Sequence, residues 1–70
     1  MIKQELGNKL KELRKGEHLT QQQVADYLNV AQPIYQRFEK GVYECSYEQL
    51  VMLCDLFDVS ADYLLGRSEY

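Results

Sequence analysis

Residues 19–41 read LTQQQVADYLNVAQPIYQRFEKG and have the pattern of two short helices that meet at a tight turn. Ala25 is a small residue at a point where the two helices must approach each other closely. Val30 supplies an apolar anchor in the turn, and Gly41 ends the second helix. The spacing of these positions predicts the local fold better than any single residue does.

A longer helix is predicted before this segment. Apolar residues recur at three- and four-residue spacing at Ile2, Leu6, Leu10 and Leu13, and Gly16 is expected to stop the helix. The helix that follows should begin after Thr20, because Thr20 and Gln23 form a capping-box pattern. Its buried residues are expected to be Val24, Ala25 and Leu28.

The second helix of the 19–41 segment is expected between Gln32 and Lys40, with Gly41 in the left-handed conformation after it. Pro33 fixes the start of this helix, since proline is best tolerated at the first helical position. Proline also disfavours helical geometry in the residue before it, so Gln32 is the expected N-cap.

Two more helices are predicted toward the end of the chain. Ser46 and Gln49 form another capping box, and the helix that follows carries an apolar stripe of Leu50, Leu53, Cys54 and Phe57. Ser60 is expected to cap a short last helix with Ala61, Leu64 and Leu65, which Gly66 stops. No segment has the pattern of a strand, so we expect an all-α, compact bundle of five helices.

Length and composition exclude several classes of protein. Seventy residues correspond to one small domain, 1–70, and no apolar run approaches the roughly 18 residues needed to span a bilayer. The N-terminus lacks the pattern of a secretory signal, which predicts a cytoplasmic protein whose Cys45 and Cys54 are reduced thiols. Two thiols and the single His18 are too few for a structural zinc site, so neither a metal nor a cofactor is expected. The sequence shows no catalytic arrangement of serine, cysteine or paired carboxylates and no glycine-rich phosphate loop, so we do not expect an enzyme.

The net charge of −3 is unfavourable for a nucleic-acid binder, because lysine and arginine supply most of the non-specific affinity for phosphate. The charge is unevenly distributed, however. Residues 1–35 contain five basic and four acidic residues, whereas residues 36–70 contain three basic and seven acidic ones. Most of the negative charge therefore follows the predicted 32–40 helix and can face away from a duplex.

At 100° per residue, the 32–40 helix has a polar and an apolar face. Ile34, Tyr35 and Phe38 occupy the apolar face, which can pack on other helices. A glutamine can bond adenine N6 and N7, and an arginine can bond guanine O6 and N7 or a phosphate. The alternative is that these polar residues are only solvated, as on most amphipathic helices. The polar face consists of Gln32, Pro33, Gln36, Arg37 and Lys40.

The chain resembles the helix-turn-helix family of phage Cro and cI repressors from about Leu6 to Gly66. The matching runs are LGNKLKELR from Leu6, LTQ from Leu19, the Val24-Ala25 and Leu28-Asn29-Val30 packing positions, FEKG from Phe38, and VSADYLLG from Val59. The resemblance implies a lambda-repressor-like fold with a helix-turn-helix at residues 21–40.

The same resemblance implies roles for particular residues. Gln32, Pro33, Gln36 and Arg37 would face the major groove. Thr20 and Gln21 would contact phosphate at a helix N-terminus, although water can satisfy the same groups. Arg14 and Glu39 would form a partly buried ion pair, the alternative being two separate solvated charges. Lys40 would contact phosphate without reading sequence.

Several positions depart from the family pattern. Ala31 stands where relatives usually have a capping serine or threonine, so the helix loses a cap. Pro33 can offer only an apolar contact. Tyr35 replaces an aliphatic core residue, and its hydroxyl must find a partner or reach the surface. Residues 42–48 contain two glutamates, Glu44 and Glu48, instead of basic residues. In this segment the hydroxyls of Tyr43 and Tyr47 are the groups expected to donate to phosphate.

Together these features predict a sequence-specific DNA-binding transcriptional regulator, with a repressor as the expected type. It should bind operator half-sites of double-stranded DNA as a homodimer, paired through the last helix and residues 67–70. The alternative is a protein-binding module, such as an antirepressor or antitoxin partner, that keeps the fold without specific DNA binding.

Overall fold

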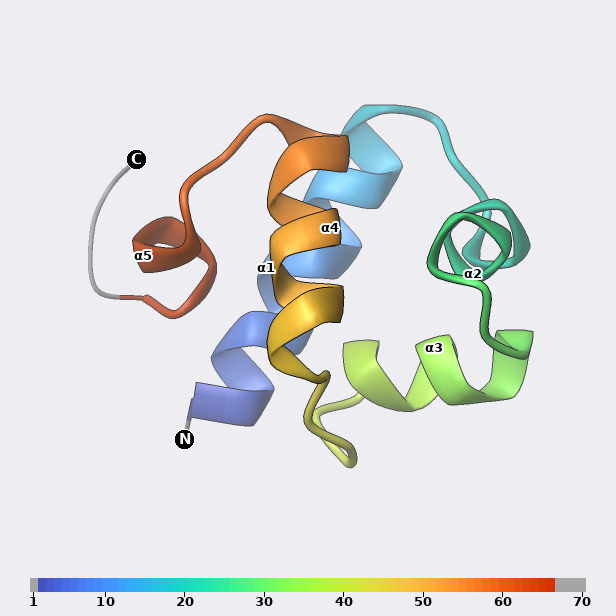
Figure 1. Ribbon diagram of the computed structural model, residues 1–70, viewed down its shortest axis with the longest axis horizontal. Coiled ribbons are helices and arrows are strands. Elements are labelled where there is room, and N and C mark those ends of the chain that lie inside the picture. Colours follow the sequence, from blue (N-terminus) through green and yellow to red (C-terminus); the bar gives the residue numbers. More distant parts are fainter. Residues whose placement is uncertain (1, 67–70) are drawn as a thin grey trace.

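A computed structural model describes residues 2–66, with side chains from Gln4 onward. The side chain of Ile2 and the proposed pairing tail 67–70 therefore lie outside the described residues. Helices are the only regular secondary structure in these residues, in agreement with the predicted all-α fold (Figure 1). They are α1 (Ile2–Gly16), α2 (Gln21–Leu28), α3 (Gln32–Glu39), α4 (Tyr47–Phe57) and α5 (Ala61–Leu64).

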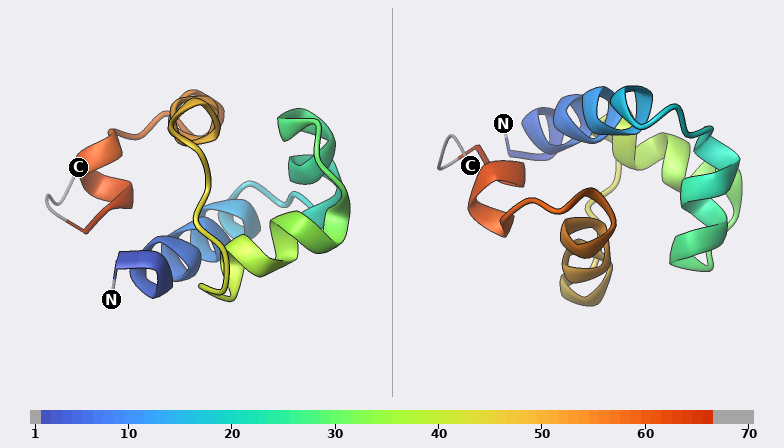
Figure 2. Two further views of the ribbon diagram at one scale, coloured as in Figure 1. Left: turned by 60° about the horizontal axis from the view of Figure 1, so that its bottom comes forward. Right: turned by 90° about the horizontal axis from the view of Figure 1, so that it is seen from above.

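The arrangement has α2 and α3 at one end, α5 at the other, and α1 and α4 between them (Figure 1). The views in Figure 2 show that α1 and α4 are distinct layers, joined at the sides by the other helices. Helix α3 packs against both α1 and α2. Helix α3 is thus supported from two directions, which fixes its angle on the bundle.

The predicted N-caps of α2, α4 and α5 are confirmed. The hydroxyl of Thr20 accepts a hydrogen bond from Gln23 N, and Gln23 Oε1 accepts one from Thr20 N. Ser46 and Gln49 form the same reciprocal pair at the start of α4, and Ser60 caps α5. These contacts are local in sequence, so they form wherever the chain places the right residues three positions apart.

The start of α3 differs from the prediction. Ala31, not Gln32, is the N-cap, with φ −68° and ψ 146°, and Gln32 is the first helical residue. Pro33 is therefore in the second helical position, where its missing N–H is still one of the donors that an α-helix leaves unbonded. Ala31 provides no side-chain cap, as the sequence predicted, but its carbonyl accepts hydrogen bonds from Ile34 N and Tyr35 N.

Helix α1 ends at Gly16, the residue predicted to stop it, but the left-handed residue after the helix is His18, with φ 58°. This position lets Leu19 N donate to the carbonyl of Arg14 at 3.0 Å and brings Leu19 onto the core. Gly41 has the predicted left-handed conformation, with φ 75°, and Gly66 also has a positive φ, 77°.

The turn between α2 and α3 is closed by Asn29, which is left-handed at φ 60°. Asparagine is one of the few residues besides glycine that visits this region readily. Its N–H donates to Ala25 and Asp26 carbonyls, while Val30 N donates to Ala25 O at 3.0 Å. Asn29 thus sets the direction in which α3 leaves α2.

The core draws on all five helices. The buried residues of α2 are Val24, Ala25 and Leu28, as predicted. Cys54, predicted to be core, is only half-buried, as is Cys45, and both are free thiols. The buried apolar side chains are Leu6, Leu10, Val24, Ala25, Leu28, Tyr35, Phe38, Leu53, Phe57 and Leu64.

Gly7 determines how closely α1 approaches the end of α3. A Cβ atom at Gly7 would lie 2.4 Å from the carbonyl oxygen of Glu39 and 2.6 Å from that of Phe38. Since real Cβ contacts are longer, any other residue here would push α3 away from α1. The glycine therefore brings Glu39 within reach of side chains on α1.

Candidate nucleic-acid interface

Helix α3 has one face on the bundle and the other in solvent. Tyr35, Phe38 and Glu39 are buried. Pro33, Arg37 and Lys40, which immediately follows the helix, are exposed. Gln32 and Gln36 are half-buried. The structure therefore brings the predicted base-reading residues to one open surface.

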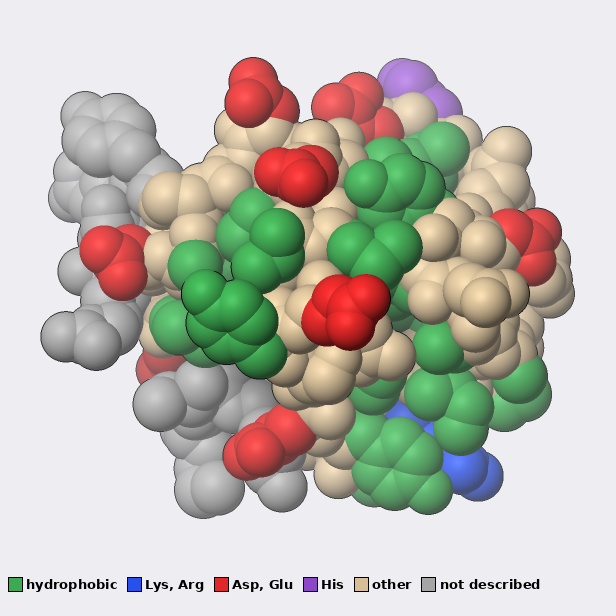
Figure 3. Space-filling view, in the orientation of Figure 1, with side chains coloured by type: hydrophobic (Ala, Val, Ile, Leu, Met, Phe, Trp, Pro, Cys, Tyr) green, Lys and Arg blue, Asp and Glu red, His purple; other side chains and the backbone are tan. Residues whose placement is uncertain are grey.

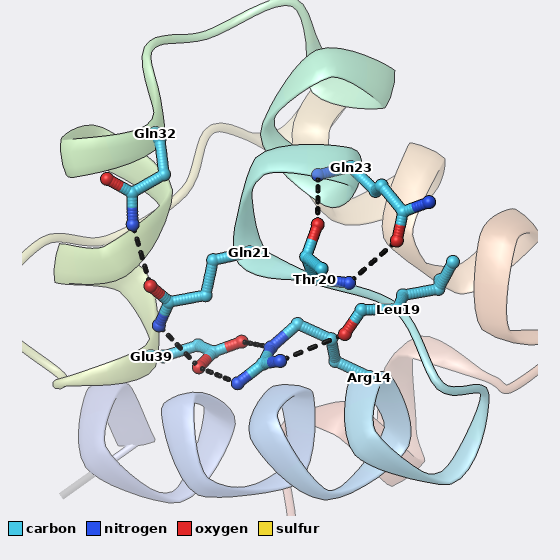
Figure 4. A network of polar contacts seen from close by, with 7 residues as sticks. All are labelled: Arg14, Leu19, Thr20, Gln21, Gln23, Gln32 and Glu39. Carbon is cyan, nitrogen blue, oxygen red and sulfur yellow. Dashed lines mark hydrogen bonds and ion pairs between the residues drawn. The ribbon is translucent and has the colours of Figure 1, made fainter.

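A chain of hydrogen bonds runs behind this surface from α3 through α2 to α1 (Figure 4). Gln32 Nε2 donates to Gln21 Oε1 at 2.7 Å, and Gln21 Nε2 donates to Glu39 Oε1 at 3.1 Å. Arg14 bonds Glu39 in turn, and its Nη1 donates to the carbonyl of Leu19 at 3.0 Å. The network ties both ends of α3 to the two helices that carry it.

Arg14 and Glu39 form a two-bond ion pair. Nε donates to Oε2 at 2.6 Å and Nη2 to Oε1 at 3.2 Å, with the two side chains 11% and 3% exposed. Burial alone would raise the pKa of Glu39, but neighbouring polar groups, Arg14 above all, outweigh burial and lower the pKa. The pKa of Arg14 is raised, chiefly by its hydrogen bond to Glu39. Both groups are therefore charged in the folded protein.

The hydroxyl of Tyr35 lies beside this pair. The side chain is fully buried, and its ring makes an edge-to-face contact with Phe38, with centroids 6.3 Å apart. Within residues 4–66 the hydroxyl has no hydrogen-bond partner, so it neither reaches the surface nor finds the partner that the sequence prediction required. Burial, and then the neighbouring Glu39 carboxylate, raises the pKa of Tyr35 far above its ordinary value.

The N-terminus of α2 lies beside Gln21 and offers free donors. Thr20 N and Gln23 N are occupied by the capping box. The N–H groups of Gln21 and Gln22 have no partner among the described residues, and the helix dipole is positive there. Thr20 is exposed, and its hydroxyl hydrogen remains available.

The loop after α3 carries the two tyrosines that were predicted to contact phosphate. Tyr43 is 43% exposed, and its hydroxyl accepts a hydrogen bond from Arg37 Nη1 at 3.1 Å. Tyr47, at the first position of α4, is 83% exposed. Glu44 and Glu48 are also exposed. Tyr43 thus contacts Arg37 of α3, a contact that the sequence did not reveal.

A sequence profile described as helix-turn-helix matches residues 10–64. The chain belongs to the Cro/cI-type helix-turn-helix family. It is 44% identical over 62 residues to the HTH-type transcriptional regulator AnsR of Bacillus subtilis, a match that covers 89% of this chain and 53% of AnsR. It is 45% identical over 56 residues to the uncharacterized HTH-type transcriptional regulator YqaE of the same organism, covering 80% and 48%.

The fold agrees with that of a solved bacterial regulator. The clp gene regulator ClgR of Corynebacterium glutamicum superposes with a TM-score of 0.85 at 24% identity, over 96% of this chain and 71% of that one. The likeness supports the lambda-repressor-like arrangement of helices. The chain spans about half the length of the curated relatives AnsR and YqaE.

In this Cro/cI-type protein, charge is unevenly distributed along the chain. Residues 41–66 contain five acidic residues and no lysine, arginine or histidine. Figure 3 shows the α4 side of the molecule, where acidic and apolar side chains alternate and basic ones are visible only at the lower right edge. The exposed cations of α3 and of its C-cap are Arg37 and Lys40.

Two classes of site find no support in the described part of the chain. Residues 2–66 contain no helix long and apolar enough to cross a membrane. The same residues contain no group of three or more histidine, cysteine or acidic side chains placed to hold a metal ion.

Proposed function

We propose that this chain is a transcriptional regulator that binds operator DNA, with residues 1–70 acting as one DNA-binding domain and α3 lying in the major groove. The observation that carries the proposal is the open face of α3. On it Pro33, Arg37 and Lys40 are exposed and Gln32 and Gln36 are half-buried, while the opposite face is held on α1 and α2. A helix supported in this way can enter a groove without unfolding its own packing.

In this proposal Gln32, Pro33, Gln36 and Arg37 read bases. Gln32 donates only one of its two Nε2 hydrogens to Gln21, so its second hydrogen and its Oε1 remain for adenine N7 and N6. Pro33 is exposed and offers an apolar surface to a thymine methyl. Arg37 retains donors for guanine.

Phosphate contacts position the domain on the duplex. The N-terminus of α2 supplies two free N–H groups and the hydroxyl of Thr20, next to Gln21, and Lys40 supplies a cation at the other end of α3. Tyr43 and Tyr47 are exposed and can donate from the following loop. These contacts should set affinity, and the base-reading set should determine sequence preference.

We further propose that the protein acts as a repressor in the cytoplasm, as a homodimer on two operator half-sites about one helical turn apart. One domain of this size covers only a few base pairs, so a second copy is needed for useful specificity. Occupying the operator is enough to exclude RNA polymerase from an overlapping promoter.

The acidic second half favours one competing function, a module that binds a basic protein surface. Five acidic residues without a basic one in residues 41–66, together with the 83% exposure of Tyr47, provide a surface of that kind. This function requires no DNA affinity.

A selection from a random duplex library, followed by titration of the selected site at several salt concentrations, separates the two functions. The proposed function predicts an enriched motif and an affinity that falls with salt, with a log–log slope of about −0.9 per phosphate contacted. Failure to enrich any motif, with negligible binding at all salt concentrations, would support the protein-binding module.

A further inference from the structure

Tyr43 contacts Arg37 in three separate ways. Arg37 Nη1 donates to the Tyr43 hydroxyl at 3.1 Å, and the guanidinium carbon lies 5.2 Å from the centroid of the Tyr43 ring. The backbone adds a third contact, because Tyr43 N donates to the carbonyl of Arg37 at 3.3 Å. A hydrogen bond, a cation–π contact and a backbone bond thus join the same two residues.

The backbone after α3 brings these residues together. Gly41 has φ 75°, a conformation that turns the chain back toward the helix it has just left. Val42 N then donates to the Arg37 carbonyl at 3.0 Å, one residue before Tyr43 does the same. A Cβ atom at Gly41 would lie 2.9 Å from Gln4 Cα, so this return is also packed against α1. Tyr43 is therefore fixed relative to α3.

We propose that Tyr43 is a positioning residue that sets the sequence preference of Arg37. The inference rests on the proposed function, in which Arg37 reads a base. An exposed arginine loses rotamer freedom when it is immobilised on DNA, and this loss weakens binding. Because Tyr43 already restricts the guanidinium in the free protein, less freedom is lost on the correct base.

The chemistry leaves Arg37 able to read guanine. A guanidinium has five N–H donors, and the Tyr43 hydroxyl takes one, which leaves four for guanine O6 and N7. The Tyr43 ring also restricts where the guanidinium can lie, so Arg37 should favour one base position. A tyrosine that only donated to phosphate would raise affinity for every sequence alike.

The test compares Tyr43→Phe, Tyr43→Leu, Arg37→Ala and the double variant Arg37→Ala with Tyr43→Phe. Phenylalanine keeps the ring and removes the hydroxyl, whereas leucine removes both contacts. Tyr27→Phe is a matched control, because Tyr27 is a 42% exposed tyrosine outside the proposed DNA-contact residues. Each variant is titrated against the selected operator and against the same site with the Arg37-read guanine replaced.

The expected result is a loss of discrimination at that one base pair. Discrimination is measured as the affinity for the operator divided by the affinity for the substituted site. Tyr43→Phe should reduce this ratio about 2- to 12-fold, the change equivalent to one hydrogen bond. Tyr43→Leu should reduce the ratio further. In the Arg37→Ala background, Tyr43→Phe should not change the ratio. Tyr27→Phe should leave the ratio of the two affinities unchanged.

Two results overturn the inference. One is a Tyr43→Phe variant that loses affinity equally for both sites and still does so in the Arg37→Ala background. The other comes from the free protein: ¹⁵N relaxation of the Arg37 Nε–H group that is the same in wild type and Tyr43→Leu would show that Tyr43 does not restrict Arg37. If wild type selects no motif, the proposed function itself fails, and the relaxation data still report whether the contact exists.

Discussion

Gln32 and Gln21, the first residues of α3 and α2, are joined by a hydrogen bond of 2.7 Å from Nε2 to Oε1. The bond lies between the group proposed to read a base and the group beside the proposed phosphate site. Because Gln21 is also bonded to Glu39, it cannot move without disturbing the start and the end of α3 together. If α3 lies in the major groove as proposed, these hydrogen bonds link phosphate contact to base reading.

This linkage predicts that Gln21 and Gln32 act on DNA as a unit. Gln21→Ala should weaken operator binding, and Gln32→Ala should cost less in that background than in wild type. The coupling should be about 0.5–3 kcal/mol in a double-mutant cycle of operator affinities. Gln22→Ala is the control, because Gln22 is exposed and bonds only Asp26 within α2. Strictly additive losses would show that the two amides act independently.

The Arg14–Glu39 pair should make stability depend on pH. Folding lowers the pKa of Glu39 below its ordinary 4.5, so its contribution is fully present above that value and is lost as pH falls through the folded pKa. Urea unfolding of wild type between about pH 6 and pH 3 should show this loss of unfolding free energy. Glu39→Gln should lack the part of the loss that Glu39 contributes. Glu12→Gln, an exposed change on α1, should keep the wild-type profile.

Removing one partner of this pair leaves the other charge buried. Arg14→Ala should therefore lower the free energy of unfolding by about 3 kcal/mol at neutral pH. Replacing both, as Arg14→Met with Glu39→Leu, should cost less than either single change. A double variant with the summed loss would mean that the charges do not interact.

The unpartnered hydroxyl of Tyr35 predicts that Tyr35→Phe stabilises the fold. Removing a buried polar group without a hydrogen bond should raise the free energy of unfolding by about 1 kcal/mol, measured by urea unfolding. Tyr27→Phe, at a 42% exposed tyrosine, should change it by less than about 0.5 kcal/mol. A destabilised Tyr35→Phe would mean that the hydroxyl is bonded to Glu39 in solution.

The parts of the fold that depend on neighbouring residues were predictable from the sequence. The boxes Thr20–Gln23 and Ser46–Gln49 and the left-handed Gly41 each involve residues within one helical turn. The apolar stripe of α2 was also predictable, because the spacing of its residues follows from the period of the helix itself.

The differences come from contacts between elements. The sequence placed the N-cap at Gln32 from the proline rule alone, but the second helical position tolerates Pro33 as well. It could not reveal that Gln21 bonds Gln32, that Tyr43 bonds Arg37, or that Tyr35 is sealed in the core. Each of these depends on the distance between packed helices or on the path of a loop, which Gly7 and Gly41 help to set.

The most direct test of the account is the affinity of Arg37→Ala and Lys40→Ala for the selected operator and for random duplex DNA. Arg37→Ala should lose about 1–3 kcal/mol on the operator and much less on random DNA, because only a base contact depends on sequence. Lys40→Ala should weaken both to the same extent. Equal losses for Arg37→Ala on operator and random DNA would contradict the assignment of α3 as the helix that reads sequence.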